Sequence, residues 1–347
     1  MDLTRGFSKK MVAQGLYRAL SFLRLAVVAE IEFLKRKSDE LRMDIMDKER
    51  NKIRLQKRAD QLELLIRDRV SLMPRGRATD PVIYFITPTA FRPAQRADLT
   101  RLSYTLAHVP NLHWIVVEDT LEPSKCVSDV INRSRVKATH LFAKTRTDMK
   151  MKYADPNWRL PRGVDQRNAA LAWIRTQLSD ATTGAVYFGD DDNTYDLRLF
   201  DEIRKVKKAG VWPVGIVGGL FVETPKIGAN GSIESFNAVW KPERSFPIDM
   251  AAFALNLTLV LQNPNAGFSY DVPRGYQEST FLEGLGISRK NMEPLAASCS
   301  QVFVWHTRTE KPTLTKEKKK MLERYPKNIE EFLPLEANAL GIDLVDP

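Results

Sequence analysis

Short apolar runs that alternate with helix-like segments constrain the fold of this chain more than any other feature. Five runs rich in β-branched and aromatic residues lie at 82–87, 113–117, 140–143, 185–188 and 212–217. Strands that are apolar at consecutive positions are buried on both faces, and their alternation with helices predicts a mostly parallel sheet covered on both sides. We therefore expect an α/β fold whose ligand lies beyond the carboxyl ends of the strands.

The head of the chain has a different pattern, which predicts one long helix. Residues 16–70 contain no proline or glycine, and the segment 73–77 (MPRGR) is expected to end the helix. One heptad register collects apolar residues at Ile31, Leu34, Leu41, Ile45, Leu55, Leu62 and Ile66. Lys48, Lys52 and Ala59 interrupt that seam, so a weak coiled coil, an isolated helix and a helix docked on the body all stay open.

The positive charge of the chain is concentrated in this head. The sequence has a formal charge of +10, but residues 1–79 hold 19 Lys and Arg against 11 Asp and Glu, a surplus of 8. The remaining residues are nearly neutral, so nucleic-acid binding by the body is not expected. The simplest interpretation of the basic head is a solvated helix face.

Three further features bear on location. The two cysteines, Cys126 and Cys299, are too few for a disulfide framework, although they are able to form one bridge. The most apolar stretch of the head, 16–34, is interrupted by Arg18, Arg24, Glu30 and Glu32, so no ordinary transmembrane segment is expected. Beyond Lys311 the chain is polar and lysine-rich, which predicts a mobile tail or one that docks on a partner.

Three consecutive carboxylates, Asp190, Asp191 and Asp192, follow the apolar run 185–188. Adjacent like charges raise one another's pKa, so such a triplet is costly unless a cation or hydrogen-bond donors compensate it. Carboxylate oxygens at a strand end suit Mg²⁺ or Mn²⁺, and a metal held by one or two of them keeps positions open for phosphate oxygens. The placement predicts a metal–diphosphate site, against the alternative of an ordinary acidic turn.

Basic side chains are available to complete such a site. Arg162 and Arg167 lie at the start of a predicted helix, where cations oppose the helix dipole and so favour an anionic ligand, although surface ion pairs are an equal alternative. With Arg274, His306 and Arg308 they suit a nucleotide-sugar donor whose leaving group is a diphosphate.

Inverting sugar transfer also needs a base on the acceptor hydroxyl, and Glu278 is the candidate. The alternative for Glu278 is a carboxylate that merely complements the dipole at a helix start.

At this point the sequence resembles the β-1,3-glucuronosyltransferases, which transfer glucuronate from UDP-glucuronate to galactose-terminated glycans. The matching segments run in order from residue 82 to 312: YFITPT (84–89), HWIVVED (113–119), PRGVDQRN (161–168), VYFGDDDNTY (186–195), WPVGIVGG (212–219), FPIDMA (246–251), PRGYQES (273–279) and VWHTRTEKP (304–312). Eight collinear matches cover the whole catalytic domain of that family.

The resemblance implies a GT-A nucleotide-diphospho-sugar transferase fold and assigns roles by position. Asp192 would bind Mn²⁺, and Glu278 would be the catalytic base. The donor-binding positions are Pro88, Asp119, Arg162, Arg167, Asp190, Asp191, Arg274, His306 and Arg308, with Asp119 and Arg162 around uracil. The acceptor-binding positions are Glu223, Trp240, Arg244 and Asp249.

Trp240 bears on the choice of acceptor. The branch of the family that acts on the galactose-galactose-xylose linker of proteoglycans has Trp at this position, whereas the branch acting on N-acetyllactosamine has Phe. The resemblance therefore favours the linker and a role in glycosaminoglycan biosynthesis. A lactosamine-directed or broader enzyme and a catalytically silent relative that binds UDP or glycan remain alternatives.

The chain also departs from the family pattern. Ala90 replaces an aromatic residue that packs on uracil, with Phe91 next to it as a possible substitute. The family implies a glycoprotein of the Golgi membrane with type II orientation and a homodimer, but its usual anchor is not evident in the head. We expect four segments: a charged helical head (1–79), a UDP-sugar-binding subdomain (80–210), an acceptor-binding subdomain (211–312) and a polar tail (313–347).

Overall fold

The computed structural model describes residues 4–72, 80–151, 155, 159–179 and 182–344. Internal contacts divide the chain into two units, Met1–Leu72 and Met73–Pro347. The boundaries expected at residues 79, 210 and 312 stay predictions.

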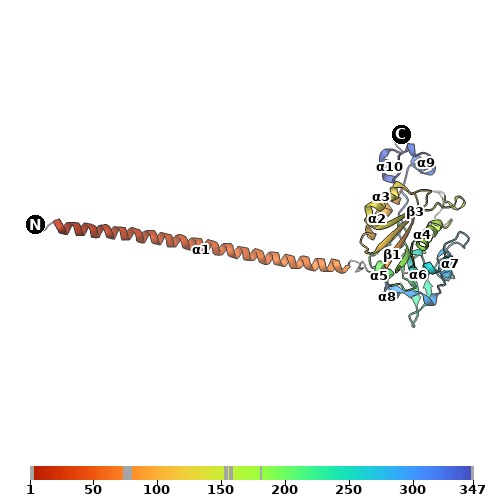
Figure 1. Ribbon diagram of the computed structural model, residues 1–347, viewed down its shortest axis with the longest axis horizontal. Helices are drawn as coiled ribbons and strands as arrows, with labels where there is room; N and C mark the ends of the chain where they lie inside the picture. The colour runs from red at the N-terminus through yellow and green to blue at the C-terminus, as the bar shows by residue number, and fades with distance from the viewer. Residues whose placement is uncertain (1–3, 73–79, 152–154, 156–158, 180–181, 345–347) are drawn as a thin grey trace. The chain divides into compact units, whose positions relative to one another are not determined.

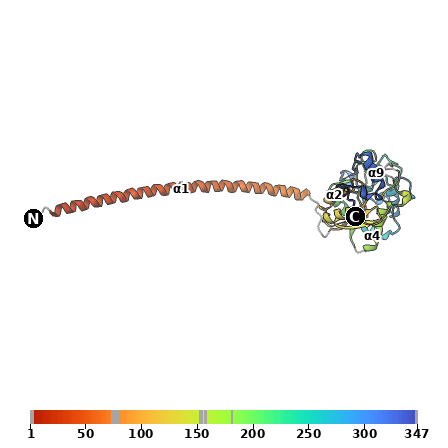
Figure 2. The same cartoon turned by 90° about the horizontal axis from the view of Figure 1, so that it is seen from above.

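The first unit is a single helix, α1 (Thr4–Leu72), which Figure 2 shows as continuous and gently curved. Every residue from 11 to 63 is exposed, including the seam side chains Ile31, Leu34, Leu41, Ile45, Leu55 and Leu62. The side chain of Ile66 and the expected helix end at 73–77 lie outside what the structure describes. Pairs one turn apart, such as Lys48 with Asp44 at 2.8 Å, support the helix on its own surface.

The same helix corrects one expectation. Within Met11–Glu63 a window reaches a mean hydropathy of 1.3, and by length and composition it is able to cross a membrane. The expectation of no spanning segment was wrong because it centred on residues 16–34 and so included Glu30 and Glu32. Residues 11–28 carry just two charges, Arg18 and Arg24.

The second unit is built on a seven-stranded sheet in the order β11-β6-β10-β4-β1-β2-β3. The strands are β1 (Val82–Thr89), β2 (Leu112–Glu118), β3 (Lys137–Phe142), β4 (Gly184–Phe188), β6 (Ala209–Val211), β10 (Phe253–Asn256) and β11 (Glu293–Pro294). β4, β1, β2 and β3 are parallel neighbours, and β10 runs antiparallel to β4 and β6. The expected mostly parallel sheet is confirmed.

Helices cover both faces of this sheet (Figure 1). Neighbouring strand residues point to opposite faces. On one face His113, which packs against Tyr84, meets Trp173 of α4 (Val164–Gln177), and on the other Phe85 meets Phe200 of α5 (Arg198–Arg204). The remaining α-helices of the layers are α2 (Gln95–Leu106), α3 (Lys125–Ser134), α6 (Leu257–Gln262), α7 (Gln277–Gly284) and α8 (Leu295–Cys299).

A second sheet has the order β5-β12-β7-β8-β9. It contains β5 (Thr194–Tyr195), β12 (Val304–Trp305), β7 (Val214–Val217), β8 (Leu220–Ile227) and β9 (Ile233–Asn237). The fifth expected strand, 212–217, is therefore wrong in its bounds: β6 ends at Val211 in one sheet and β7 begins at Val214 in the other. Gly218 and Gly219, both at positive φ, form the turn between β7 and β8.

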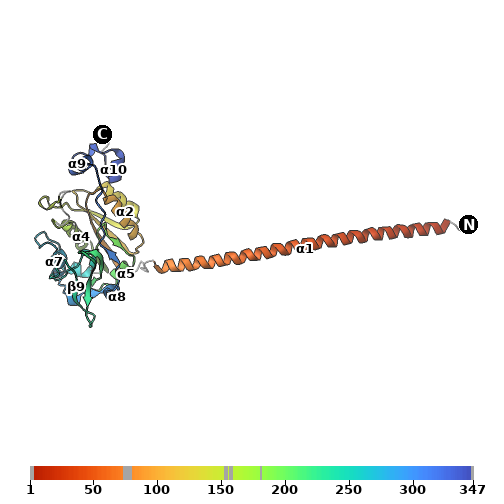
Figure 3. The ribbon, with the colours of Figure 1, turned by 180° about the vertical axis from the view of Figure 1, so that it is seen from behind.

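Residues 313–344 of the C-terminal segment pack against the body, which corrects the expectation of a mobile tail; docking on a partner stays a prediction. α9 (Lys316–Arg324) and α10 (Pro334–Leu340) enclose a small core with Met321, Phe332, Ala337 and Ile342. Tyr325 stacks on Phe91 with ring centroids 4.1 Å apart, and α10 contacts α2 (Figure 3). Apolar residues in this lysine-rich segment build the core, so the lysine content of the segment did not predict whether it folds. Short 3₁₀ helices occur at Thr147–Met149, Met250–Ala252, Arg289–Asn291 and Ile329–Glu331.

The two cysteines are free, so the possible bridge does not form. Cys126 is buried on α3, where it lies against Gly341 of the C-terminal segment. Cys299 ends α8, and its Sγ lies 3.6 Å from the carbonyl of Val211. The two thiols thus belong to different parts of the second unit.

Candidate active site

The loops after β1, β2 and β4 meet at one edge of the main sheet, because these strands are parallel neighbours. The backbone N–H of Asp119 donates to the carbonyl of Thr89 at 2.8 Å, and that of Gly189 donates to Ile86 at 2.9 Å. The carboxylate of Asp119 accepts from the backbone N–H of Thr145 at 2.7 Å. The structure thus brings Pro88, Asp119 and the acidic triplet to one edge.

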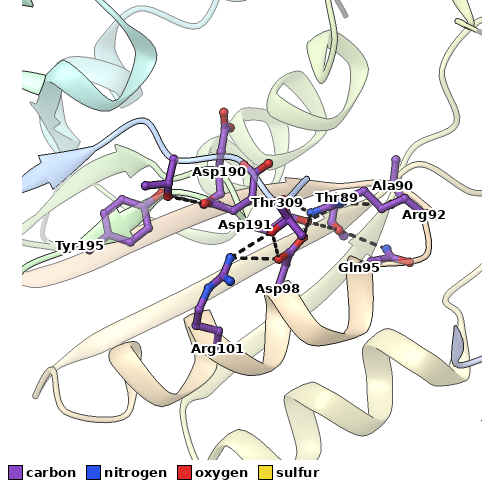
Figure 4. A network of polar contacts seen from close by, with 12 residues as sticks. Thr89, Ala90, Arg92, Gln95, Asp98, Arg101, Asp190, Asp191, Tyr195 and Thr309 are labelled. Atoms are coloured by element: carbon purple, nitrogen blue, oxygen red, sulfur yellow. Dashed lines mark hydrogen bonds and ion pairs between the residues drawn. The ribbon is translucent and has the colours of Figure 1, made fainter. Parts of the chain in front are cut away.

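Two of the three carboxylates in the triplet are each paired with an arginine. Arg167 donates to Asp190 at 2.9 Å. Arg92 donates to both oxygens of Asp191, at 2.7 and 2.9 Å, and the hydroxyl of Thr89 adds a bond of 2.7 Å (Figure 4). Burial raises the pKa of Asp191, and Arg92 and Thr89 oppose that rise. Bidentate arginine–carboxylate pairs are strong, so the chain itself compensates these two charges.

Asp192 differs from its neighbours. It is half-buried, and within the part of the chain that the structure describes its carboxylate makes no ion pair or hydrogen bond; its carbonyl accepts from Thr307 at 2.6 Å. Burial, followed by the charges of Asp191 and Asp190, raises the pKa of Asp192. An uncompensated carboxylate in a negative field fits a divalent cation. The described residues contain no cluster of three or more His, Cys, Asp or Glu side chains that could hold a metal by themselves, so a cation here would need ligand oxygens from elsewhere.

The turn that begins α4 fixes the position of the Arg167 side chain. Gly163 has a φ of +72°, and a Cβ at that position would lie 2.5 Å from Nη1 of Arg167 and 3.3 Å from Cβ of Pro88. Nη1 of Arg167 also donates to the carbonyl of Arg162 at 2.9 Å, while Arg162 itself is exposed. The buried Nε of Arg167 has no hydrogen-bond partner among the described residues. A donor left over at this position suits an anionic ligand.

A second group of acids and bases lies on the other side of the site. Glu278, in the first turn of α7, keeps 17% of its side chain exposed, and Nη1 of Arg244 lies 3.9 Å away. Burial raises the pKa of Glu278 to about 7; Asp249 adds to the rise, and Arg244 and Arg167 oppose it. Burial also raises the pKa of Glu223, on β8, to about 7, with Asp249 again adding.

His306 and Asp249 form an ion pair within this group. Nδ1 of His306 lies 3.0 Å from Asp249, and Arg308 donates to Nε2 at 3.2 Å from two nitrogens. The carboxylate of Asp249 thus faces one ring nitrogen and the guanidinium of Arg308 faces the other. Burial acts to lower the pKa of His306, but its pairing with Asp249 and the charges of Asp249 and Asp190 together outweigh burial, so the pKa is raised. Burial acts to raise the pKa of Asp249, and His306 reverses the effect.

Trp240 forms an exposed platform beside Glu278. Its side of the site is lined by cations: the guanidinium of Arg274 lies 4.6 Å from the ring centre and Nζ of Lys241 lies 5.9 Å from it. Arg244 donates to the carbonyls of Trp240 (3.0 Å) and Gly275 (2.6 Å), which fixes the platform to the loop before α7. An exposed indole face of this kind suits stacking on a sugar ring.

Sequence reasoning missed the residues that hold the triplet. Arg92 and Asp98 follow the strand end 87–89, which was singled out, but nothing in the local pattern shows that Arg92 reaches a carboxylate 99 positions later. Thr307 and Thr309 lie inside a matched segment, 304–312, and bond to Asp192 and Asp98. Phe91, considered as a partner for uracil, stacks instead on Tyr325.

Comparison with known proteins finds a family and several relatives. A family model described as Glycosyltransferase family 43 matches residues 102–310. The chain is 64% identical over 320 residues to the galactosylgalactosylxylosylprotein 3-beta-glucuronosyltransferase sqv-8 of Caenorhabditis elegans, covering 92% of this chain and 89% of that protein. It is 50% identical over 244 residues to galactosylgalactosylxylosylprotein 3-beta-glucuronosyltransferase I of Drosophila melanogaster, covering 69% and 79%. Among solved structures, S. aureus TarS 1-349 in complex with UDP-GlcNAc has a TM-score of 0.42 and 15% identity, covering 75% of this chain and 70% of that one.

Proposed function

The chain belongs to glycosyltransferase family 43, and on that premise we propose that it transfers glucuronate from UDP-glucuronate to the 3-hydroxyl of a terminal galactose. The expected GT-A fold is confirmed with the family. The names of its relatives, galactosylgalactosylxylosylprotein 3-beta-glucuronosyltransferases, favour the galactose-galactose-xylose linker of proteoglycans as the acceptor.

One observation carries the proposal: the chain holds two partly buried carboxylates without a close cation partner. Asp192 lacks a cation partner among the described residues, and the half-buried Glu278 has a pKa raised to about 7. The first suits a divalent cation beside a diphosphate, and the second suits a general base near neutral pH.

The donor end of the site would bind UDP-glucuronate. Asp192 would hold Mn²⁺, which when bound supplies positive charge to the leaving diphosphate. Arg274, His306 and Arg308 offer further cationic groups for phosphate or glucuronate oxygens, and Arg167 keeps its Nε available. Asp119 and Arg162 are assigned to the uracil end.

The acceptor end would bind and activate the sugar hydroxyl. Glu278 takes the proton of the galactose 3-hydroxyl, whose oxygen attacks the anomeric carbon of glucuronate from the face opposite the diphosphate. The bond from that carbon to the diphosphate oxygen breaks, and UDP leaves with the bonding electrons. One displacement inverts the anomeric configuration.

Acceptor recognition would rest on the groups around Glu278. Glu223, Arg244 and Asp249 present hydrogen-bond donors and acceptors, and Trp240 would stack on the next sugar. Lactosamine ends are the second candidate acceptor, because the same polar groups suit a terminal galactose.

We further propose that the apolar part of α1 anchors the protein in the Golgi membrane in type II orientation, and that the enzyme works as a homodimer. The support for an anchor is the window with two charges within residues 11–28. Deleting residues 1–72 should release the protein from membranes while retaining transfer, and a truncated protein that stays in the membrane would refute the anchor.

An acceptor panel tests the function. The protein is incubated with UDP-glucuronate and Mn²⁺ together with galactose-galactose-xylose, N-acetyllactosamine or no acceptor, and the products are identified by mass spectrometry. Transfer to the linker trisaccharide is expected. Tight UDP binding without transfer to either acceptor would favour a catalytically silent relative, the rival that Ala90 suggests.

A further inference from the structure

Arg92 occupies a central position in the polar network of Figure 4. It follows β1, and its side chain keeps 30% of its surface exposed, while both of its partners are buried. It donates to both oxygens of Asp191 and, through Nη2, to Asp98 at 2.6 Å. One guanidinium therefore binds two buried carboxylates that come from different elements.

Asp98 extends this network to the segment after β12. Its side chain is fully buried and accepts from Arg92, from Arg101 at 3.0 Å and from the hydroxyl of Thr309 at 2.5 Å. Two residues before Thr309, Thr307 donates to the carbonyl of Asp192. The segment that carries His306 and Arg308 is thus tied to α2 at one point and to the triplet at another.

The orientation of Asp191 has a consequence for its neighbour. Both oxygens of Asp191 accept hydrogen bonds from Arg92 and Thr89, so its charge is already compensated within the chain. Asp190 is likewise engaged by Arg167. Asp192 is then the one carboxylate of the triplet whose charge is left for a cation, and the charges of Arg92 and Asp191 both act on it.

We propose that Arg92 is a positioning residue of the donor site: by neutralising Asp191 and fixing it to Asp98, it leaves Asp192 as the cation ligand and sets the net charge around it. This inference rests on the proposed function, because it takes Asp192 to hold the divalent cation. It assigns to Asp191 a structural partner within the chain in place of the donor contact that the resemblance implies.

Two substitutions that change the charge near Asp192 in opposite directions test the inference, because they should shift Mn²⁺ affinity in opposite directions. Mn²⁺ binding to the full-length protein is measured in the presence of UDP, whose diphosphate supplies further ligand oxygens, from the free-ion electron paramagnetic resonance signal compared with that of UDP alone. Arg92→Met adds an uncompensated negative charge, so Mn²⁺ should bind on the order of tenfold more tightly. Asp191→Asn removes one of the two carboxylates that compensate Arg92 and so makes the surroundings of Asp192 more positive. Mn²⁺ should then bind on the order of tenfold more weakly.

The double variant and two controls complete the design. Arg92→Met with Asp191→Asn should return Mn²⁺ affinity to within about twofold of the unmodified protein, because the two charges are removed together. Arg101→Met also removes a cation from Asp98, but Arg101 does not contact Asp191. This variant should leave Mn²⁺ affinity unchanged. Arg92→Lys retains the charge but not the two-pronged geometry, so Mn²⁺ affinity should be kept while kcat falls and the KM for UDP-glucuronate changes little.

The outcomes separate the inference from the function it rests on. Equal shifts of one sign in both single variants, or none, would overturn the role of Arg92 while the unmodified protein still binds Mn²⁺. Absence of Mn²⁺ binding to the unmodified protein would overturn the cation site itself. If Arg92→Met fails to fold, two other results decide whether Arg92 has this role: the weaker Mn²⁺ binding of Asp191→Asn and the kinetics of Arg92→Lys. Both variants keep a cation at position 92.

Discussion

The carboxylates that pair with Arg167 and Arg92 contrast with the two glutamates of the acceptor side, Glu223 and Glu278. On the donor side, Asp190 and Asp191 are each engaged by an arginine at 2.7–2.9 Å. On the acceptor side, Glu278 has its nearest arginine nitrogen at 3.9 Å, and the pKa values of Glu278 and Glu223 rise to about 7. The comparison teaches that fully paired carboxylates position other groups, whereas weakly paired ones are able to exchange protons near neutral pH.

The largest expected effect comes from removing the proton acceptor. Glu278→Gln keeps the size of the side chain but cannot take the acceptor's proton, so kcat should fall on the order of 10³-fold. UDP binding, measured by calorimetry in the presence of Mn²⁺, should stay within about twofold. As a matched control, Glu283→Gln changes an exposed carboxylate on the same helix and should leave kcat intact. Substantial turnover by Glu278→Gln would remove this residue as the base.

Asp192→Asn should have the next largest effect. The substitution removes the carboxylate that lacks a cation partner among the described residues, so kcat should fall about 10²-fold and Mn²⁺ binding should weaken strongly. Asp196→Asn is a suitable control, because Asp196 pairs with Arg198 at 2.6 Å outside the triplet. Unchanged Mn²⁺ binding by Asp192→Asn would contradict the contrast between paired and unpaired carboxylates.

The pH dependence of kcat should follow the ionisation of Glu278 on the acceptor side. A base must be deprotonated, and the pKa of Glu278 is raised to about 7, so activity is low below that pKa and rises as pH increases through it. For one group the deprotonated fraction grows about tenfold between pH 6 and 8. A rate profile measured under saturating substrates checks this. A profile that is flat from pH 5 to 8 would show that the carboxyl ionises far below neutrality.

Removal of the aromatic platform should have the smallest effect. Trp240→Ala deletes a stacking surface worth about 1 kcal/mol, so the KM for a trisaccharide acceptor should rise roughly fivefold. A single galactoside does not reach the platform and should keep its KM. Trp240→Phe would retain most of the stacking, and comparing it on linker and lactosamine acceptors shows whether this residue selects between them. Equal loss on the short and long acceptors would argue against stacking on the next sugar.

The sequence predicted the parts of this fold that local patterns encode. The apolar runs at 82–87, 113–117 and 185–188 became β1, β2 and β4, and their order brought the triplet to the sheet edge. The antiparallel insertion of β10 between β4 and β6 was not predicted, because strand pairing between distant segments leaves no local signal. The fold of the C-terminal segment was missed for the same reason: Tyr325 finds Phe91 across more than 200 positions.

The candidate site shows the same division. The resemblance assigned Asp190 and Arg167 to donor binding, and the two side chains lie 2.9 Å apart. It could not assign the partner of Asp191, because a bond between Arg92 and Asp191 depends on how two strand ends are placed side by side. Hydrogen-bond geometry and burial, which set the pKa of Glu278, also exist only in the folded chain.

The configuration of the product tests the central claim most directly. The unmodified protein is incubated with UDP-glucuronate, Mn²⁺ and galactose-galactose-xylose, and the anomeric coupling and linkage of the new sugar are determined by NMR. The account predicts glucuronate linked to the 3-position of the terminal galactose with the configuration opposite to that in the donor. A product with retained configuration would contradict direct displacement with Glu278 as the base, and absence of transfer to any galactose-terminated acceptor would contradict the proposed function.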